Sequence, residues 1–359
     1  MANINKFDFK IKTLSPVHIG SGDKYDGSEY FLDVINEVNV FKRINIQKYY
    51  ASLNDIEQEK FIKNLQKKNY QLKKIDSTKF TRYLAFNKVI NRPNPTNEII
   101  ENIKTFDKAY IPGSSIKGAI ENVIFYNALD KNDIPDLFNG KWINKRYINS
   151  FFSPSGKAHD NIMRFMQIKD STSVKNPFIY EVSSVKPKKD GGHQQVIKTY
   201  LETIYSSKNL LSSSITTNYD KNAYKKLKIE DKSYMIDIDF IKESIYNFSS
   251  DYIDYELDFC KKHKLNNLAR FYRNCKKQNS KNTPLLKIGH GSGFLATTVS
   301  LKIKQYGFDY FNLVKRNTKG KKSKSDFPIT RKIITQDVTV NGKPAKMDKT
   351  IGWCQLLFE

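Results

Sequence analysis

Three glycine-containing stretches carry most of the residues in this sequence that could do chemistry. They are HIGSGD at 18–23, AYIPGSSIKGAI at 109–120 and KIGHGSGF at 287–294. Each follows a strand-like run, so each predicts a turn at the end of a strand. Glycine at such a turn lets the backbone approach a ligand closely and present its N–H groups. We therefore treat the three stretches as the candidate binding elements of the chain.

The segment 109–120 matches a nucleotide phosphate loop only in the spacing of its glycines. Gly113 and Gly118 are separated as in a Walker loop, but alanine and isoleucine follow the second glycine. That loop needs lysine and a hydroxyl residue there, and Lys117 stands on the wrong side of the glycine. The segment therefore argues against an ATPase.

A helix start explains the same segment better. The apolar pattern after Pro112 predicts a helix that runs to about Leu129. Ser114 or Ser115 is expected to cap the start of this helix. The free N–H groups of the helix start attract anions, and Lys117 adds a positive charge there. An ordinary capped helix that binds nothing is the alternative interpretation.

The stretch 18–23 offers an imidazole, a hydroxyl group and a bend. Gly20 and Gly22 allow a tight turn, Ser21 can donate or accept a hydrogen bond, and His18 could contact a phosphate. A histidine at a strand end can also simply pack into the core.

Two carboxylates follow this stretch and suggest an alternative chemistry. Asp23 or Asp26 could hold a metal ion or, with His18, assist attack by a 2′-hydroxyl group in RNA cleavage. Aspartate in a glycine-rich loop is also the usual turn former, and we favour the turn.

The stretch 287–294 superficially matches a dinucleotide-binding loop. Its glycines are too evenly spaced for that fingerprint, and although Asp309 lies at a plausible distance, no convincing βαβ unit surrounds it. A backbone-amide surface for an RNA phosphate or a neighbouring protein fits better. The residues of this surface are Gly289, His290, Gly291, Ser292, Gly293 and Phe294.

Charge is the strongest signal in the composition. The 359 residues include 61 Lys and Arg against 37 Asp and Glu, which gives a net charge of +24. Such an excess favours a polyanionic partner, although a lysine-rich proteome would also produce it. The basic residues cluster at 260–277, at 315–324 and beside Arg331 and Lys332, and 21 Tyr and 23 Phe could stack on bases. Basic and aromatic residues together favour single-stranded nucleic acid.

The elements that must position these residues alternate between strands and helices. This pattern predicts an α+β fold of two RRM-like (ferredoxin-like) units with helical insertions. We expect one domain at 1–185, with a helical insertion near 46–90, and a second at 186–359, with a helical insertion near 234–277 and the glycine-rich loop 289–293. The composition also excludes several classes of protein. No apolar run approaches bilayer length, the first residues lack a signal core, and three scattered cysteines fit a reducing cytoplasm.

The ordered set of the three stretches, with FPITRKI at 327–333 after them, resembles the RAMP superfamily of CRISPR-associated proteins. IPGSSIKG at 111–118 is the most specific part. The length and the C-terminal pair of motifs are most similar to the fifth-subunit family of the type III-A Csm complex. The likeness is thin across 46–106 and 205–280.

The resemblance implies a subunit that binds guide RNA (crRNA), caps its 3′ region and contributes to guide maturation in antiviral defence. Its implied partners are target RNA nearby, the repeating backbone subunit, the small subunit and possible trimming nucleases, with no membrane and no cofactor. The residues around Asp23 and Asp26 depart from the slicing loop of the backbone subunits, so we expect no catalytic residue and no metal. An endoribonuclease that uses His18 or Asp26 is the alternative. The implied RNA contacts are His18, Gly20, Ser21, Gly22, Gly113, Ser114, Ser115, Lys117, Gly289, His290, Gly291, Ser292, Gly293, Phe294, Arg331 and Lys332.

Overall fold

The structure is a computed structural model, and it describes most of the chain. The basic run 315–324, Asp309, Asn341 and Gly342 lie outside the described residues. The described residues are 3–70, 77–89, 94, 96–139, 142–189, 191–205, 210–308, 328–340 and 343–359.

The first sheet is antiparallel and has the strand order β11-β14-β1-β18-β15. Phe9 and Ile11 alternate with exposed or half-buried residues along its central strand, as a period-two pattern requires. Its strands are β1 (Asn3–Thr13), β11 (Met166–Ile168), β14 (Leu211–Tyr219), β15 (Leu285–Lys287) and β18 (Trp353–Phe358).

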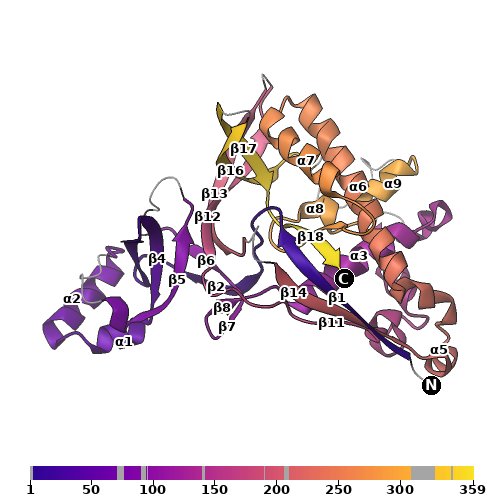
Figure 1. The fold of residues 1–359 in the computed structure, drawn as a ribbon, viewed down its shortest axis with the longest axis horizontal. Helices are drawn as coiled ribbons and strands as arrows, with labels where there is room; N and C mark the ends of the chain where they lie inside the picture. Colours follow the sequence, from indigo (N-terminus) through magenta and orange to yellow (C-terminus); the bar gives the residue numbers. More distant parts are fainter. Residues whose placement is uncertain are drawn as a thin grey trace.

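Two helices complete this sheet into a ferredoxin-like unit. The helix α3 (Gly113–Ala128) connects β1 to β11, and α6 (Ile238–Lys262) follows β14 before the chain returns to β18. The order β1-α3-β11-β14-α6-β18 is that of a split βαβ fold. The two helices and the sheet share one hydrophobic core, with α7 (Asn266–Gln278) packed against α6 (Figure 1).

The second sheet has nine strands, in the order β2-β6-β13-β12-β5-β4-β3, with β16 paired to β12 and β17. Two of its contacts are parallel, β12 with β5 and β13 with β6. Its strands are β2 (Gly20–Tyr25), β3 (Tyr30–Ile35), β4 (Val38–Ile44), β5 (Thr81–Asn87), β6 (Ile99–Asn102), β12 (Phe178–Pro187), β13 (His193–Thr203), β16 (Arg331–Val340) and β17 (Lys343–Thr350).

Shorter elements surround the two sheets. In Figure 1, α1 and α2 form a lobe beside β4 and β5, and α5 lies near the N-terminus at the opposite end. The lobe has its own small core around Tyr49 and Phe61. These elements are α1 (Ile46–Ala51), α2 (Asp55–Gln66), β7 (Lys104–Thr105), β8 (Lys108–Ala109), β9 (Phe138–Asn139), β10 (Trp142–Ile143), α4 (Lys145–Phe152), α5 (Lys221–Leu227), α8 (Gly293–Ala296) and α9 (Ser300–Gln305).

The α+β fold class predicted from the sequence is confirmed, and the helices near 234–277 are found as α6 and α7. The predicted helical insertion near 46–90 is too long, because β5 is a strand in which Tyr83 and Ala85 are buried in alternation. The domain boundary at residue 185 stays a prediction. The first sheet draws its strands from both sides of that residue, since β1 pairs with β14 and β18.

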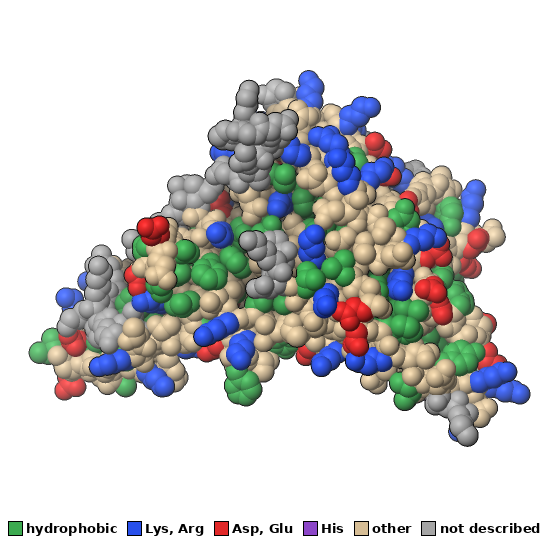
Figure 2. Space-filling view, viewed as in Figure 1, with side chains coloured by type: hydrophobic (Ala, Val, Ile, Leu, Met, Phe, Trp, Pro, Cys, Tyr) green, Lys and Arg blue, Asp and Glu red, His purple; other side chains and the backbone are tan. Residues whose placement is uncertain are grey.

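The basic cluster on α6 and α7 lies on the surface, where Figure 2 shows Lys and Arg side chains gathered over these helices. The aromatic residues of this cluster are not on the surface with the charged side chains. Phe271 and Tyr272 are buried in the main core, so they are not available to stack on bases. In the part of the chain that the structure describes, no helix has the length and apolar character needed to cross a bilayer.

Candidate nucleic-acid interface

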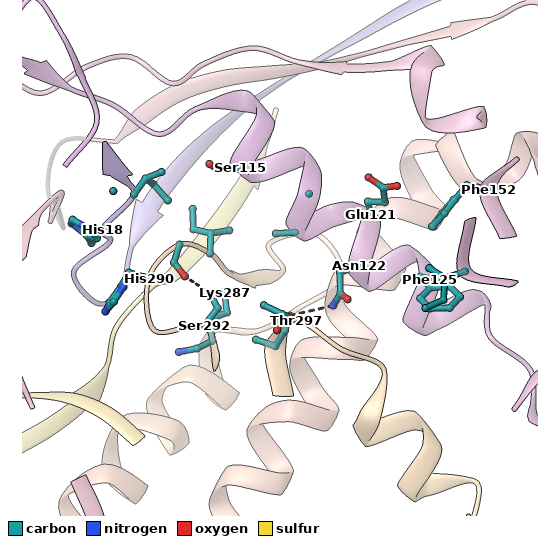
Figure 3. A pocket seen from close by; sticks show the side chains of 18 of the residues that line it. His18, Ser115, Glu121, Asn122, Phe125, Phe152, Lys287, His290, Ser292 and Thr297 are labelled. Carbon is teal, nitrogen blue, oxygen red and sulfur yellow. Dashed lines mark hydrogen bonds between the residues drawn. The ribbon is translucent and has the colours of Figure 1, made fainter. Parts of the chain in front are cut away.

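An open groove of about 810 Å³ lies where the three glycine-containing stretches meet. Figure 3 shows α3 along one wall, with Ser115, Glu121 and Asn122, and His18 and His290 together at one end. Gly20 and Gly22 also line the groove, as do Gly118, Gly289 and Ser292. The groove thus brings together residues between positions 18 and 292, which lie far apart in the sequence.

The His18 loop is held by the second sheet. The His18 side chain is 1% exposed, and its Nδ1–H donates to the carbonyl oxygen of Glu202 at 2.6 Å. The next residue is also fixed, because the Ile19 N–H donates to Asn102 Oδ1 at 2.9 Å. Burial lowers the pKa of His18 to about 4, so the imidazole is neutral at physiological pH. His18 therefore shapes the groove wall and brings no positive charge to it.

A buried carboxylate stands behind this loop. Glu202 is fully buried and accepts hydrogen bonds from the hydroxyl groups of Tyr25 and Tyr83, each at 2.7 Å. It also accepts the Asn102 N–H at 3.2 Å and pairs with the Lys104 ammonium group. Both carboxylate oxygens are thus satisfied, which is what makes a buried charge tolerable.

The glycine-rich loop 289–293 forms the facing wall. Gly289, Gly291 and Gly293 all have positive φ, at 75°, 81° and 73°. The His290 N–H donates to the carbonyl oxygen of His18 at 2.8 Å, so the two loops are joined. A Cβ atom on Gly289 would lie 2.3 Å from that same oxygen. Only glycine fits there, both for conformation and for space.

Lys332 brings positive charge to this wall. Its Nζ donates to the Nε2 atom of His290 at 2.8 Å, and the His290 ring lies edge-on to His18 with 5.6 Å between ring centroids. Burial, and then the charge of Lys332, lowers the pKa of His290 to about 4. The lysine is half-buried, and burial lowers its pKa too. Lys332 is thus bound to the groove-lining residue His290, although Lys332 itself is not among the lining residues.

Arg331 does not join them, which corrects the expectation that it contacts RNA. Its side chain is 6% exposed, its Nε donates to Glu256 Oε2 at 2.8 Å, and its guanidinium lies over Phe259. A paired and buried guanidinium cannot reach a phosphate. Its place is structural, since it ties β16 to α6.

The start of α3 also differs from the expected arrangement. Neither Ser114 nor Ser115 caps the helix, because the N-cap is Pro112 and the Gly113 N–H donates to Asp170 Oδ1 at 2.7 Å. The protein's own carboxylate thus takes the place predicted for an anion. Ser114 is exposed, and Ser115 lines the groove.

Lys117 lies on a different side of α3 from the one expected. Its Nζ donates to the carbonyl oxygen of Met166 at 2.8 Å, and burial lowers its pKa. Lys117 is absent from the groove lining, whereas Gly118, the next residue, is part of it. At this point of α3 the groove is therefore lined by Gly118 and not by the side chain of Lys117.

The remaining predicted residues have local roles. Asp26 accepts hydrogen bonds from both the N–H and the hydroxyl group of Ser28, at 2.9 and 2.7 Å, which is the turn-forming role favoured from the sequence. Asp23 is exposed and lies within β2, so the turn favoured for it from the sequence is wrong, and its N–H donates to Ser21 Oγ. Phe294 packs against the main core. Over the described ranges, no group of three His, Cys, Asp or Glu side chains is placed to hold a metal ion.

The groove also contains a buried lysine that was not predicted from the sequence. Lys287 is 5% exposed, its Nζ donates to the carbonyl oxygen of Ile351 at 2.7 Å, and it lies over the Trp353 ring. Burial lowers its pKa to about 7. A lysine that ends the otherwise apolar run PLLK was the available signal. Asn122, which donates to the Ala296 carbonyl oxygen at 3.1 Å, gave no signal at all.

The chain is similar to two curated proteins of CRISPR systems. Among curated proteins, Csm5 of a CRISPR system in Methanocaldococcus jannaschii is 25% identical over 325 residues, which cover 81% of this chain and 72% of that protein. Csm5 of Streptococcus thermophilus is 26% identical over 249 residues, 60% of this chain and 65% of that protein.

Two solved structures are similar throughout. A chain of a Csm–crRNA–target RNA ternary complex of a type III-A CRISPR–Cas system gives a TM-score of 0.69 at 20% identity and covers 98% of this chain and 100% of that one. The crystal structure of Csm5 of T. onnurineus gives a TM-score of 0.60 at 18% identity, and the match covers 96% of this chain and 99% of that one. These likenesses support the fold.

The sequence model of the RAMP superfamily matches residues 10–337, which include all three glycine-containing stretches. The match covers far more than half of the chain. The resemblance read from the three stretches is therefore confirmed, and the chain belongs to the RAMP superfamily.

Proposed function

We propose that this chain binds the 3′ region of the guide RNA at the end of a type III-A CRISPR effector complex and caps that complex. One observation carries the proposal. Three glycine-containing stretches, far apart in sequence, form one open groove lined by backbone, by two imidazoles and by Lys287, with Lys332 bound to His290 beside it. The similarity to Csm5 proteins and to a chain of a Csm–crRNA–target RNA complex supports the assignment.

The groove suits an RNA backbone better than a small anion. Glycine residues at 20, 22, 118 and 289 bring the main chain to its surface, so a strand can approach closely. The cations near it are Lys287 and Lys332, each of which already donates to a protein acceptor. The lining also includes the Glu121 carboxylate and apolar side chains such as Phe125 and Phe152. We therefore expect phosphates to be held chiefly by main-chain groups and by these two lysines.

The proposed partners follow from this role. They are the guide RNA, the target RNA nearby, the last repeating backbone subunit, the small subunit and nucleases that trim the guide. The proposed setting is the cytoplasm. We further propose that the chain has no catalytic role of its own, because Asp26 forms a turn and is absent from the groove that His18 lines. The endoribonuclease alternative gains no specific support from this arrangement.

The test is to purify the chain from its native host in mild salt and to sequence the RNA bound to it. Repeat-derived tags joined to spacer sequences, together with the partner subunits, are the expected result. Random cellular RNA or none would contradict the proposal.

Two variants make this test specific. Lys332→Glu places a carboxylate beside the groove-lining residue His290 and should lower the recovery of guide RNA. Lys63→Glu reverses a charge on α2, where the side chain is 68% exposed and far from the groove-lining segments, and should leave it unchanged. Equal recovery with both variants would mean that the groove does not hold the guide.

A further inference from the structure

The hairpin formed by β7 and β8 ends in an aromatic side chain that nothing in the fold uses. Phe106, at its tip, is 94% exposed, the highest value among the exposed large hydrophobic residues of the described part of the chain. Phe106 and Asp107 have φ of 50° and 60°, so both turn residues are left-handed. Asparagine or glycine is the usual choice there, and a bulky side chain is strained. Strain and exposure together indicate a role outside folding.

The hairpin is held rigidly. Arg82 donates to Asp107 through Nη2 at 2.6 Å and through Nε at 3.4 Å, which fixes the turn to β5. At the base, Ala109 and Val174 exchange backbone hydrogen bonds of 3.0 and 2.7 Å. The tip therefore presents the ring in a defined position, which lowers the entropy cost of a contact.

Both ends of the hairpin lead into the groove. The strand before it, β6, contributes Ile100 to the groove lining, and the helix after it, α3, contributes Ser115. The connecting Ile103 N–H donates to the carbonyl oxygen of Ile19 at 2.7 Å, and Lys104 pairs with Glu202 behind the His18 loop. Figure 1 shows β7 and β8 beside β2 and β6 at the edge of the molecule.

We propose that Phe106 stacks on an unstacked base of the RNA strand that occupies the groove, and this inference rests on the proposed function. The ring is a single aromatic among polar neighbours, since Thr105 and Lys108 on either side are also exposed and no other residue of the hairpin is a large exposed hydrophobic. A residue that dominates a protein–protein interface is usually surrounded by other contacts that exclude water. A nucleic-acid base, in contrast, can stack on a single isolated ring such as that of Phe106.

Charge near the tip agrees with a nucleic-acid partner. Lys108 and Lys175 are exposed on either side of the Ala109–Val174 bridge, and Asp107 is neutralised by Arg82. Figure 2 shows Lys and Arg side chains along the same edge of the molecule. A neighbouring protein subunit is the other candidate for this contact, and the test separates the two.

The test measures the affinity of the full chain for fluorescently labelled single-stranded RNA. Phe106→Leu keeps an apolar side chain but removes the ring and should weaken binding roughly tenfold, within the range measured for base–aromatic stacking. Phe106→Trp should retain affinity, and its emission should be quenched by RNA beyond any change in the wild-type protein. Ile56→Ala, which removes another exposed hydrophobic (81%) on α2, should bind as the wild type does.

A fold control accompanies these variants. Phe106→Gly relieves the left-handed strain, so its Tm should equal or exceed that of the wild type while its RNA affinity falls. Wild-type affinity in Phe106→Leu together with weakened binding in Lys332→Glu would overturn the stacking inference and leave the proposed function intact. If Phe106→Leu instead lost only a partner subunit, the ring would contact protein and the inference would be wrong. Absence of RNA binding by the wild type would overturn the function itself.

Discussion

The two walls of the groove are each supported by a buried carboxylate, but the two carboxylates are satisfied differently. Glu202, behind the His18 loop, receives two tyrosine hydroxyl groups, a backbone N–H and an ammonium group. Glu256, which lies behind the Gly loop on α6, pairs with Arg331 through Oε2, while its Oε1 has no partner. Both side chains are fully buried.

The difference indicates that the walls have different rigidity. We call the segment around His18 the His18 wall and the loop 289–293 the Gly wall. The His18 wall is tied into the second sheet at two points, through the Glu202 carbonyl oxygen and Asn102. The Gly wall is joined to it by a backbone bond from His290 to His18, and it is also tied to the chain just before β18 by bonds from the Ile288 N–H to Gly352 and from Lys287 Nζ to Ile351. Its glycines, however, take conformations that cost other residues free energy. We therefore expect the Gly wall to be the more easily disturbed half of the groove, and the predictions below test that comparison.

The largest effect should come from disturbing the close contact between the two walls at Gly289 and His18. Gly289→Ala adds a Cβ atom 2.3 Å from the His18 carbonyl oxygen and 2.6 Å from Ile19 Cδ1, at a φ of 75°. The His18 carbonyl oxygen belongs to the main chain and cannot move aside without a large cost in free energy, so the loop must shift away from His18. We expect a loss of more than about 2 kcal/mol in the free energy of unfolding and a loss of RNA binding. Thermal unfolding and an RNA-binding titration measure the two effects.

Gly293→Ala is the matched control for that substitution. Its φ is 73°, but a Cβ atom there would meet nothing within 4 Å. The cost should be conformational only, about 1 kcal/mol, with RNA binding retained. Similar losses at both positions would show that conformation, and not the contact between the walls, decides the effect.

The second prediction exchanges each buried ion pair for apolar side chains. Glu256→Leu with Arg331→Met removes a pair in which Glu256 Oε1 and Arg331 Nη2 have no partner, so stability should change by less than about 1 kcal/mol or rise. Glu202→Leu with Lys104→Met leaves the hydroxyl groups of Tyr25 and Tyr83 without their acceptor. Each buried unsatisfied group costs about 1–3 kcal/mol, so this double variant should be clearly destabilised.

Denaturant unfolding of the two double variants compares them directly. If the Glu256 pair proved the more costly to replace, the Gly wall would depend on its ion pair more than the hydrogen bonds suggest. The comparison between the walls would then have to be reversed.

The three glycine-containing stretches could be found from the sequence because their signals are local. Glycine spacing, a strand before each and a helix after two of them identified the segments that meet in the groove. The turn between β3 and β4 has an equally local signal, because Asn36 and Glu37 lie between two apolar strand-like runs, and both residues have positive φ.

The residues that the sequence misplaced depend on distant partners. Arg331 looked like a phosphate contact, but its partner Glu256 lies 75 residues earlier, and Lys104 lies 98 residues before Glu202. The strand β14 has a weak local signal because LSSSITTNY is rich in serine and threonine, yet it pairs with β1 on one side and with β11 on the other. The pairing of two strands that lie about 200 residues apart leaves no pattern in the sequence of either strand.

The third prediction concerns Lys287 and gives a smaller, pH-dependent effect. Burial lowers its pKa from 10.5 to about 7. Below pH 7 both the folded and unfolded states carry the proton, and the full cost of the buried charge is present. Between about 7 and 10.5 only the unfolded state holds it, so the stability of the wild type should rise with pH in this window.

Lys287→Met removes that dependence. The variant should gain stability over the wild type most clearly below pH 7, and the gain should shrink toward pH 10.5. Chemical denaturation at several pH values measures the difference. A gain that did not vary with pH would mean that the ammonium group is as well stabilised in the fold as in water.

The smallest effect, and the one that bears most directly on the comparison, is in the salt dependence of RNA binding. Lys332 is the cation of the Gly wall nearest to its surface, and its ammonium group already donates to His290. On a single strand, each neutralised phosphate contributes about 0.7 to the slope of log affinity against log salt. Lys332→Gln should therefore reduce the slope by about 0.7 if its charge meets one phosphate, while Lys63→Gln should leave it unchanged. Since His18 is buried and neutral, the opposite wall has no comparable charge to lose. An unchanged slope in Lys332→Gln would mean that the Gly wall contacts RNA through backbone groups alone, and the two walls would then differ in rigidity but not in charge.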